Sequence, residues 1–350
     1  MLLHERWCEK AVAQLANRKS VTIRDVAERA GVSIATVSYV LSGKKRISST
    51  TVEKVLKAAE DLGYVPNKVA RSLKEATTQI IGVLVPDIRN PFFPDVVDAL
   101  SEALSEKGYQ IIVASSDEDP RKQKEIIHSF LEYRVAGIIA IPTGSSSSVV
   151  KDFEKLCFTT STVLLDRSVD VPCPKVVLDN RKAAEDITRF ILDRGHSRIG
   201  LIAPPLHLSI GLERFEGYAK ALRDRGINLD PALVYEGNLF AESGRRAFAY
   251  FMSMEKDRRP TAILSCSDVM TLGVLREIRK RGLKIPEDIS IASFDNPDYF
   301  ELLNPPLTCI AQPTIALGKK AAELMTEALK GRKMAGVYKY KGKLVVRESV

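Results

Sequence analysis

The order of apolar and polar residues along this chain of 350 residues changes character near residue 80. Before that point, apolar residues recur every three or four positions in short stretches, a period typical of small amphipathic helices. After it, short continuous apolar runs alternate with longer amphipathic stretches, as expected for parallel strands whose sheet is covered on both faces by helices. The pattern therefore predicts an N-terminal all-α domain followed by a larger α/β domain.

The stretch from Val21 to Leu41 predicts two short helices joined by a tight turn. Thr22 can cap the first helix, and Gly31 can end it because glycine adopts a left-handed backbone without steric cost. Ser33 can cap the second helix. The apolar face of the pair is formed by Ile23, Val26, Ala27, Ala30, Val37 and Val40.

The second helix leaves Ile34, Ala35, Ser38 and Tyr39 facing outward. One interpretation is a helix-turn-helix whose second helix enters the major groove of DNA, and the other is an ordinary helical hairpin within a larger core. Charge favours the first, because residues 1–78 hold 14 Lys and Arg against 8 Asp and Glu, whereas the remainder holds 38 against 36. The basic residues 44–46 follow immediately and can lie along phosphates.

A third helix is predicted from Ser49 to Leu62, with Thr50 and Glu53 at the spacing of a capping box. Its apolar face is formed by Val52, Val55, Leu56, Ala59 and Leu62.

Four motifs then occur in one order: Val-Thr-Ile-x-Asp-Val-Ala at 21–27, Gly-Val-Ser-x-x-Thr-Val-Ser at 31–38, Gly-Tyr-x-Pro-Asn at 63–67 and Ala-Arg-Ser-Leu at 70–73. With them, the sequence from Val21 onward resembles the lactose-repressor (LacI/GalR) family of bacterial transcription regulators, which carry a periplasmic-binding-protein-like effector domain. The resemblance implies a helix-turn-helix domain over 21–66, a hinge over 67–78 and a two-lobed domain for effector binding and dimerisation over 79–350. Residues 1–20 precede the family's usual start and are either an extra helix or the result of a start site assigned too far upstream.

The resemblance also assigns the DNA contacts. Ile34, Ala35 and Tyr39 match base-reading positions, where the first two can meet thymine methyl groups. Tyr39 stands where arginine or histidine is common, so the operator is not expected to be that of relatives. The hinge residues at the minor groove are Ala70, Leu73 and Lys74, of which Leu73 matches the family's minor-groove wedge. The residues that grip phosphates are Thr22, Ser33, Thr36, Ser38, Ser42, Ser48 and Thr51.

The larger domain contains too many strand candidates for one compact sheet, so two doubly wound parallel-sheet lobes are expected, split near Asp179. The strand candidates are 80–85, 110–114, 137–141, 163–165, 176–178, 198–202, 262–265 and 289–293, and the helix candidates are 96–107, 122–133, 181–194, 213–225 and 270–281. In the family the chain crosses between the lobes three times. This implies a first lobe over about 79–179 plus 310–337 and a second over 180–309 plus 338–350.

Polar and aromatic residues follow these strands, where ligands of such sheets bind. Carboxylates, an amide and guanidinium groups beside aromatic rings suit a sugar, which needs hydrogen bonds to its hydroxyls and a flat surface against its apolar face. Several of these positions also resemble ribose-binding periplasmic proteins, but Leu212 and Leu239 replace an arginine and an aromatic residue, which argues against ribose itself. The predicted effector-binding residues are Asn90, Phe92, Phe93, Asp166, Arg167, Arg214, Ser267, Asp268, Asp295 and Gln312. Capping of helices is the alternative role for some of them.

Other features of the sequence argue against several classes of protein, namely disulfide-rich, metal-binding, enzymatic and membrane proteins. The five cysteines, Cys8, Cys157, Cys173, Cys266 and Cys309, are scattered without a C-x-x-C spacing, so neither a disulfide framework nor a metal site is expected. A dinucleotide fingerprint, a Walker loop and a nucleophile elbow are all missing from the sequence, so no catalytic residues and no cofactor are expected. No apolar run is long enough for a membrane span, and the start lacks a signal-peptide pattern, which predicts a cytoplasmic protein.

The sequence therefore predicts a homodimeric, sequence-specific transcriptional regulator that binds a near-palindromic double-stranded DNA operator, namely a repressor of carbohydrate-utilisation genes. A small sugar-like effector between the lobes would change its operator affinity. A purine-like or protein corepressor is the alternative effector, and a sugar-binding receptor with no DNA role is the alternative class. The chain ends without a leucine heptad, so a dimer is expected rather than a tetramer.

Overall fold

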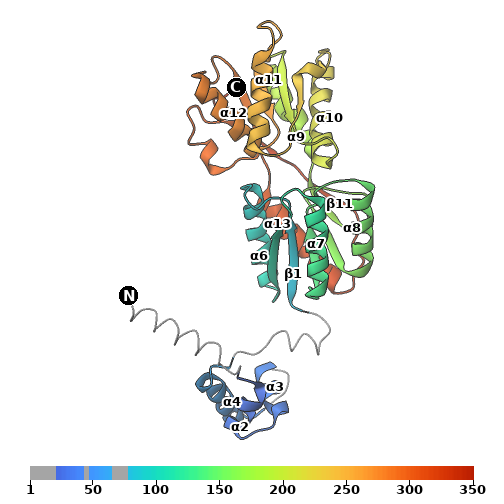
Figure 1. Ribbon diagram of the computed structural model, residues 1–350, viewed down its shortest axis with the longest axis vertical. Helices are drawn as coiled ribbons and strands as arrows, with labels where there is room; N and C mark the ends of the chain where they lie inside the picture. The colour runs from blue at the N-terminus through green and yellow to red at the C-terminus, as the bar shows by residue number, and fades with distance from the viewer. Residues whose placement is uncertain (1–20, 43–46, 65–77) are drawn as a thin grey trace, which may run out of the picture. The chain divides into compact units, whose positions relative to one another are not determined.

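The computed structural model describes residues 21–42, 47–64 and 78–350 (Figure 1). The chain divides into two compact units, with the boundary between residues 76 and 77. The first is helical, and the second holds two six-stranded sheets, each covered by helices on both faces. The predicted fold class is therefore confirmed. No helix in the described ranges is long and apolar enough to cross a membrane.

In its described residues, the N-terminal unit has three helices: α2 (Ile23–Ala30), α3 (Ile34–Ser42) and α4 (Ser49–Asp61). Thr22 and Asp25 form a capping box at the start of α2, and Gly31 ends that helix with a φ of 66°. The Ser33 hydroxyl accepts a hydrogen bond from the backbone N–H of Thr36 at 3.1 Å and so caps α3. These caps confirm the predicted helix-turn-helix geometry.

Six buried side chains hold these helices together: Val26, Ala27, Val37, Val55, Ala58 and Ala59. Two predictions for α4 were wrong. Leu56 is 50% exposed, because the face that meets α2 and α3 follows Val55, Ala58 and Ala59 and leaves Leu56 at its border. Thr50 does not begin a capping box, because it lies inside the first turn of a helix that Ser48 precedes.

The first lobe of the larger unit is a parallel sheet in the order β11-β5-β4-β3-β1-β2. Its strands are β1 (Ile80–Val85), β2 (Gln110–Ser115), β3 (Gly137–Ala140), β4 (Ser161–Leu165), β5 (Lys175–Leu178) and β11 (Val337–Tyr340). Helices α6 (Phe92–Ser105) and α13 (Thr314–Leu329) cover one face. Helices α7 (Pro120–Glu132) and α8 (Ser147–Thr159) cover the other.

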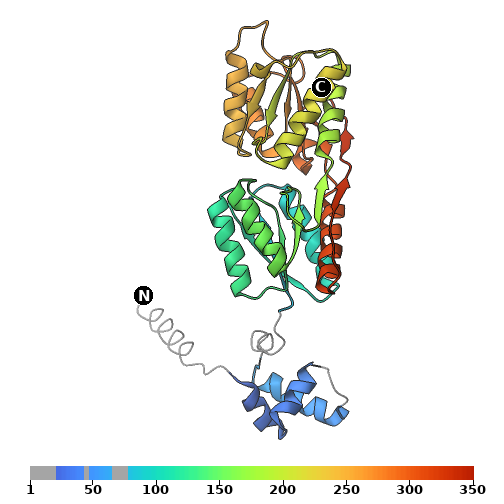
Figure 2. The same cartoon turned by 90° about the vertical axis from the view of Figure 1, so that its right-hand side faces the viewer.

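The second lobe repeats this arrangement in the order β12-β10-β9-β8-β6-β7, with β12 antiparallel to β10. Its strands are β6 (Ile199–Ala203), β7 (Val234–Glu236), β8 (Ala262–Ser265), β9 (Ser290–Phe294), β10 (Thr308–Ala311) and β12 (Lys343–Val345). Helices α9 (Asn180–Asp193) and α10 (Ser209–Asp224) cover one face, and α11 (Ala241–Ser253) and α12 (Asp268–Arg281) cover the other (Figure 2).

The chain crosses between the two sheets three times, after β5, after β10 and after β11. Two predicted lobe boundaries need correction. Residue 310 lies inside β10, which belongs to the second sheet, and residue 338 lies inside β11, which belongs to the first. β10 pairs with its neighbours β9 and β12 in the second sheet and β11 pairs along its full length with β5 in the first, so each crossing comes a few residues later than predicted.

The connection from β4 to β5 carries no helix. It runs from Asp166 and Arg167, at the carboxyl end of β4, to Cys173 and Pro174, just before β5. Val169, Val171 and Cys173 are buried and pack into the core beneath α7 and α8. This segment, residues 166–174, therefore joins the end of β4 to the start of β5 with its buried residues in the core and Asp170 and Pro172 exposed.

Candidate DNA-binding surface and effector site

The outward face of α3 has the predicted orientation. Ile34 is 43% exposed and Tyr39 is 38% exposed, whereas Val37 on the opposite face is fully buried. Ala35 is also exposed. A helix held to its unit by one buried face presents the other face to a groove of DNA, as a recognition helix requires.

Hydroxyl groups cluster at the starts of the three helices. Thr22 lies at the start of α2, Ser33 and Thr36 at the start of α3, and Ser48 and Thr51 before and within the first turn of α4. The hydroxyl pairs of α3 and α4 lie 2.9 Å and 2.8 Å apart. A helix start carries partial positive charge and free N–H groups, so these positions suit phosphates.

Several predicted DNA contacts lie outside the described residues. These are Ala70, Leu73 and Lys74 of the hinge, the basic residues 44–46 and the side chain of Ser42. Ser38 is described and is half-buried on α3.

Six charged residues and one amide from both lobes of the larger unit form one polar group, which we call the interlobe cluster: Glu118, Asp166, Arg167, Arg214, Asp268, Asp295 and Gln312. Asp166, at the end of β4, interacts with Arg167 of its own lobe and with Arg214 and Asp295 of the second. Burial raises the pKa of Asp166, although the two arginines oppose this shift. The predicted strand-end residues of the two lobes are therefore brought together.

Asp166 and Asp295 occupy equivalent places in the two lobes. Each follows a central strand, and each has a left-handed backbone, with φ values of 61° and 68°. Such a conformation costs free energy for a residue other than glycine and is often found at functional sites.

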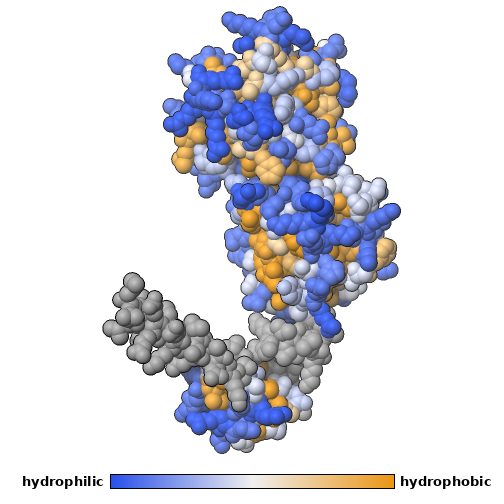
Figure 3. All heavy atoms as spheres, in the orientation of Figure 1, coloured by the Kyte–Doolittle hydropathy of each residue, from blue (hydrophilic) through white to orange (hydrophobic). Residues whose placement is uncertain are grey.

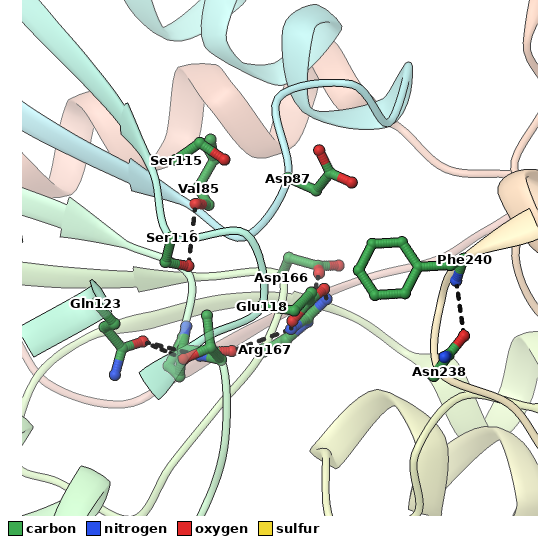
Figure 4. Close-up of polar contacts among 12 residues, drawn as sticks. Val85, Asp87, Ser115, Ser116, Glu118, Gln123, Asp166, Arg167, Asn238 and Phe240 are labelled. Atoms are coloured by element: carbon green, nitrogen blue, oxygen red, sulfur yellow. Dashed lines mark hydrogen bonds and ion pairs between the residues drawn. The ribbon is translucent and has the colours of Figure 1, made fainter. Parts of the chain in front are cut away.

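The Arg167 side chain is largely committed to the protein. Its Nη1 and Nη2 atoms donate to the two carboxylate oxygens of Glu118 at 2.7 Å and 2.6 Å, and Nη1 also donates to the Pro142 carbonyl at 3.3 Å (Figure 4). The side chain is 3% exposed. A buried guanidinium needs such compensation for its lost hydration. Among the described residues, Glu118 and the Pro142 carbonyl therefore occupy Nη1 and Nη2, and Nε is the nitrogen of this guanidinium that lacks a hydrogen bond. The role of Arg167 as an effector-binding residue stays a prediction.

Arg214 is likewise held by its own lobe. Its Nε donates to Asn180 Oδ1 and its Nη1 to the Cys266 carbonyl, both at 2.8 Å, while the guanidinium carbon lies 4.2 Å from the centre of the Phe294 ring. Within the described part of the chain, Nη2 has no hydrogen-bond acceptor. Arg214 can therefore donate to a ligand from one guanidinium nitrogen rather than from all three.

Unsatisfied polar atoms gather at this cluster. Among the described residues, five buried side-chain atoms lack a hydrogen bond, and one of them, Thr188 Oγ1, lies elsewhere in α9. The other four belong to predicted effector-binding residues: Arg167 Nε, Ser267 Oγ, Asp268 Oδ2 and Gln312 Oε1. Because buried polar atoms are normally hydrogen-bonded, this concentration leaves donors and acceptors to which a polar molecule can bond.

Asp268 is a buried carboxylate of the cluster with a second carboxylate, Asp295, as its neighbour. Burial raises its pKa to about 8, and the neighbouring Asp295 adds to the shift. The Ser267 hydroxyl lies beside its carboxylate without completing a hydrogen bond. Asp268 is therefore largely protonated at neutral pH and can donate as well as accept.

The pKa of Asp268 predicts a pH dependence of stability. An unfolded chain loses this proton near pH 4, whereas the folded chain keeps it up to about pH 8, so the stability linked to Asp268 is lost as pH rises between these values. In the Asp268→Asn variant, the free energy of unfolding should fall less between pH 5 and pH 8 than in the parent. Urea unfolding at both pH values measures this difference. Asp257→Asn, at an exposed turn residue, is the matched control, and parallel pH profiles for the parent and Asp268→Asn would contradict the assignment.

The aromatic part of the site differs from the prediction. Asn90 Oδ1 accepts the backbone N–H of Phe92 at 2.9 Å, which is the capping role, and the rings of Phe92 and Phe93 pack in the core of the first lobe. From the second lobe, the ring of Phe240 points toward Asp166 and Glu118 (Figure 4).

Sequence reasoning missed four residues of this region: Glu118, Asn180, Phe240 and Tyr299. Glu118 could have been found, because it follows the second strand as the other candidates follow theirs. Phe240 stands one position after Leu239, which turns into the hydrophobic core. The pKa of Tyr299 is raised by burial and by Asp268 and Asp295, which places it beside these carboxylates.

The chemistry of the cluster is that of recognition. It offers acceptors, donors and an aromatic ring, but it contains no nucleophile paired with a base. In the described ranges, no three His, Cys, Asp or Glu side chains are grouped so that they could hold a metal ion.

Comparison with known proteins agrees with this geometry. Residues 22–67 match the model of the lacI family of bacterial regulatory proteins, and residues 188–350 match the periplasmic binding protein-like domain. The HTH-type transcriptional repressor PurR of Vibrio atlanticus (strain LGP32) is 33% identical over 323 residues, which cover 89% of this chain and 92% of that protein. The chain belongs to the LacI family. The HTH-type transcriptional repressor CytR of Escherichia coli (strain K12) is also 33% identical, over 314 residues covering 89% of this chain and 91% of that protein.

Solved structures of LacI-family proteins share the fold of this chain. The lac repressor dimer bound to operator and the anti-inducer ONPF has a TM-score of 0.83 and 28% identity, over 95% of this chain and 99% of the other. The regulator CelR in its cellobiose complex has a TM-score of 0.70 and 28% identity, over 94% and 100%. As a LacI-family protein, the chain is a DNA-binding transcriptional repressor and not an enzyme, and a receptor with no DNA role is excluded.

Proposed function

We propose that this LacI-family repressor acts in the cytoplasm as a homodimer on a near-palindromic operator, and that a small sugar-like effector bound at the interlobe cluster changes its operator affinity. The observation that carries the effector proposal is the set of four unsatisfied buried atoms on predicted effector-binding residues. The lac repressor dimer on its operator and the CelR–cellobiose complex are structural precedents for the two kinds of partner.

The donors and acceptors of the cluster suit a ring with several hydroxyl groups. Arg167 Nε and Arg214 Nη2 can donate to ligand oxygens, whereas Asp268 Oδ2 and Gln312 Oε1 can accept from ligand hydroxyls. The ring of Phe240 faces the carboxylate side of the cluster and offers a flat apolar surface. A strongly anionic ligand is disfavoured, because Asp166, Asp295 and Glu118 are all carboxylates.

A homodimer is supported by apolar surface on the first lobe. Figure 3 shows apolar side chains gathered on the visible face of this lobe, between α6 and α7. Separately, the edge strand β2 exposes Ile112 to 41%, and the loop after β1, which bonds to Ser115 at the end of β2, exposes Ile88 to 45%. An exposed apolar patch beside an unpaired strand edge is typical of a surface that another chain covers.

Two measurements test the proposed function. Gel-shift assays with fragments of the host genome should retain a small set of fragments sharing a near-palindrome, and retention that does not depend on sequence would contradict operator binding. A thermal-shift screen with pentoses, hexoses, disaccharides and purines should raise the melting temperature with a sugar, because a ligand that binds only the folded state stabilises it. A purine as the sole stabilising compound would overturn the sugar assignment.

The outward face of α3 predicts a specific effect on DNA sequence preference. Tyr39→Ala should weaken binding to the selected operator by about tenfold or more, because one good base contact is worth about 1–3 kcal/mol. Its unfolding free energy should barely change, since Tyr39 lies at the surface. Quantitative gel shifts on operator and random DNA measure the effect, with Leu56→Ala, another exposed apolar residue of this unit, as the control. Equal losses on both DNAs would remove Tyr39 from base recognition.

A further inference from the structure

A cavity of about 500 Å³ lies at the edge of the first lobe, far along the sheet from the interlobe cluster. It opens between the C-terminal ends of α8 and α13 and the starts of β4 and β5. Two cysteines line it, Cys157 from the last turn of α8 and Cys173 from the end of the 166–174 segment. The repressor function described above assigns no role to this cavity.

The two thiols lie next to each other and differ in character. Cys173 is buried, at 5% exposure, whereas Cys157 is half-buried and can be reached from the cavity. The neighbouring Cys173 thiol lowers the pKa of Cys157, and the Lys175 ammonium acts in the same direction, although burial opposes both. The same contact and burial raise the pKa of Cys173. Cys157 is therefore the thiol that becomes the nucleophilic thiolate.

The rim of the cavity carries an aromatic ring and two basic side chains. Phe158 is 82% exposed beside Cys157, and the basic residues Arg332 and Lys333 line the opposite wall. Arg332 is paired with Glu327, whereas Lys333 has no ion-pair partner among the described residues. A metal site is not indicated, because only two thiols are present and, within the described ranges, no third ligand completes a group.

We propose that Cys157 and Cys173 form a redox-active dithiol that a hydroperoxide converts into an intramolecular disulfide. In the first step, the Cys157 thiolate attacks one oxygen of the hydroperoxide. An S–O bond forms and the O–O bond breaks. The sulfur is oxidised to a sulfenic acid, and the other oxygen leaves with a proton as water or an alcohol.

In the second step, the Cys173 sulfur gives up its proton and attacks the sulfenic sulfur of Cys157. An S–S bond forms, the S–O bond breaks, and hydroxide leaves with that proton as water. Overall, two thiols and one hydroperoxide yield one disulfide and either two waters or one water and an alcohol. The closeness of the two thiols makes this second step faster than further oxidation of Cys157.

The other two described cysteines serve as internal controls. Cys266 and Cys309 are fully buried, and burial raises their pKa values to about 12 and about 11. The Cys309 thiol donates to Asn296 Oδ1 at 3.1 Å, and neither cysteine lies beside another thiol in the described ranges. Both should stay reduced under conditions that oxidise the pair.

The chain offers a direct assay. Full-length protein is treated with hydrogen peroxide at pH 7, its free thiols are alkylated, and it is digested with trypsin. Cleavage after Lys155, Arg167 and Lys175 separates Cys157 and Cys173 into adjacent peptides, 156–167 and 168–175. Mass spectrometry should find these two peptides joined and lighter by two hydrogens than their sum, and dithiothreitol should restore both thiols.

Two variants distinguish the proposed mechanism from general oxidation. In Cys173→Ser, Cys157 should accumulate sulfenic acid that dimedone traps, because the resolving thiol is gone. In Cys157→Ser, Cys173 should remain reduced. Free thiols at both positions in peroxide-treated, folded parent protein would overturn the proposal. So would oxidation of Cys266 or Cys309 at the same rate, or a disulfide to Cys8 in place of the 157–173 link. Circular dichroism of each sample establishes that it is folded.

Discussion

Arg214→Ala is expected to lower the free energy of unfolding by about 3–5 kcal/mol, the range for removing one partner from a buried charged network. Arg214 is 3% exposed and joins three elements, through Asn180 at the start of α9, the Cys266 carbonyl after β8 and the Phe294 ring of β9. Alanine leaves two buried acceptors unsatisfied and a space beside Phe294. The variant should also lose its effector response, since the Asp166 carboxylate loses a positive neighbour.

Urea unfolding and effector-dependent gel shifts measure the two effects separately. Arg223→Ala, at an exposed position of the same helix, is the matched control and should change stability by less than about 0.5 kcal/mol. Arg214→Lys keeps the positive charge but loses the planar set of guanidinium donors. Compared with Arg214→Ala, it should therefore regain part of the stability and little of the effector response. A folded Arg214→Ala protein with a normal effector response would exclude Arg214 from the effector site.

Gly273→Ala is expected to destabilise the second lobe by about 3 kcal/mol or more, although alanine is the better helix former by about 1 kcal/mol. Helices α11 and α12 cross with their backbones in contact at Gly244 and Gly273. A Cβ at position 273 would overlap the Ala241 carbonyl oxygen, which is backbone and cannot rotate away. The helices must then separate and loosen the core around Phe248 and Phe251, so the packing loss outweighs the gain in propensity.

The same substitution at Gly144 is the matched control. A Cβ there would meet only Val149, at an ordinary contact distance of 3.8 Å, and the backbone is not left-handed. Gly144→Ala should change the free energy of unfolding by less than about 1 kcal/mol. Chemical denaturation of both variants measures the contrast, and similar values for the two would show that the α11–α12 crossing can relax.

The sequence pattern predicted the strands well because the central strands of both sheets are buried on both faces. β1 and β8 have the predicted bounds, and each is a continuous run of apolar or small residues. It missed α8, α11 and α13. Ser147–Thr159 and Ala241–Ser253 carry serines and charges among their apolar residues, and neither helix has a side-chain cap at its start that would mark it in the sequence. The edge strands β7 and β12 are three residues long, too short to show a period.

The sequence predicted which residues of the candidate site lie at the ends of strands. It did not predict which side chains distant in the sequence those residues contact. Asp166 and Asp295 follow their strands directly, so the end of each apolar run marked them. Nothing in the local sequence shows that Arg167 is paired with Glu118, 49 residues away, or Arg214 with Asn180, 34 residues away. The resemblance to ribose-binding proteins indicated which residues could contact a ligand. It did not indicate how many donor atoms of those residues are left available to the ligand by their contacts within the protein.

The helical unit and the larger unit have separate hydrophobic clusters, and this separation affects how the DNA and effector specificities of such repressors can change. Among the described residues, the cluster of the helical unit contains only residues between 23 and 64, and the clusters of the larger unit contain only residues from 80 onward. A substitution on the outward face of α3 therefore leaves every core of the larger unit untouched. A new operator preference and a new effector specificity can thus be acquired through separate mutations. A gene fusion near residue 77 would replace the DNA-binding unit without changing the core of the effector-binding unit.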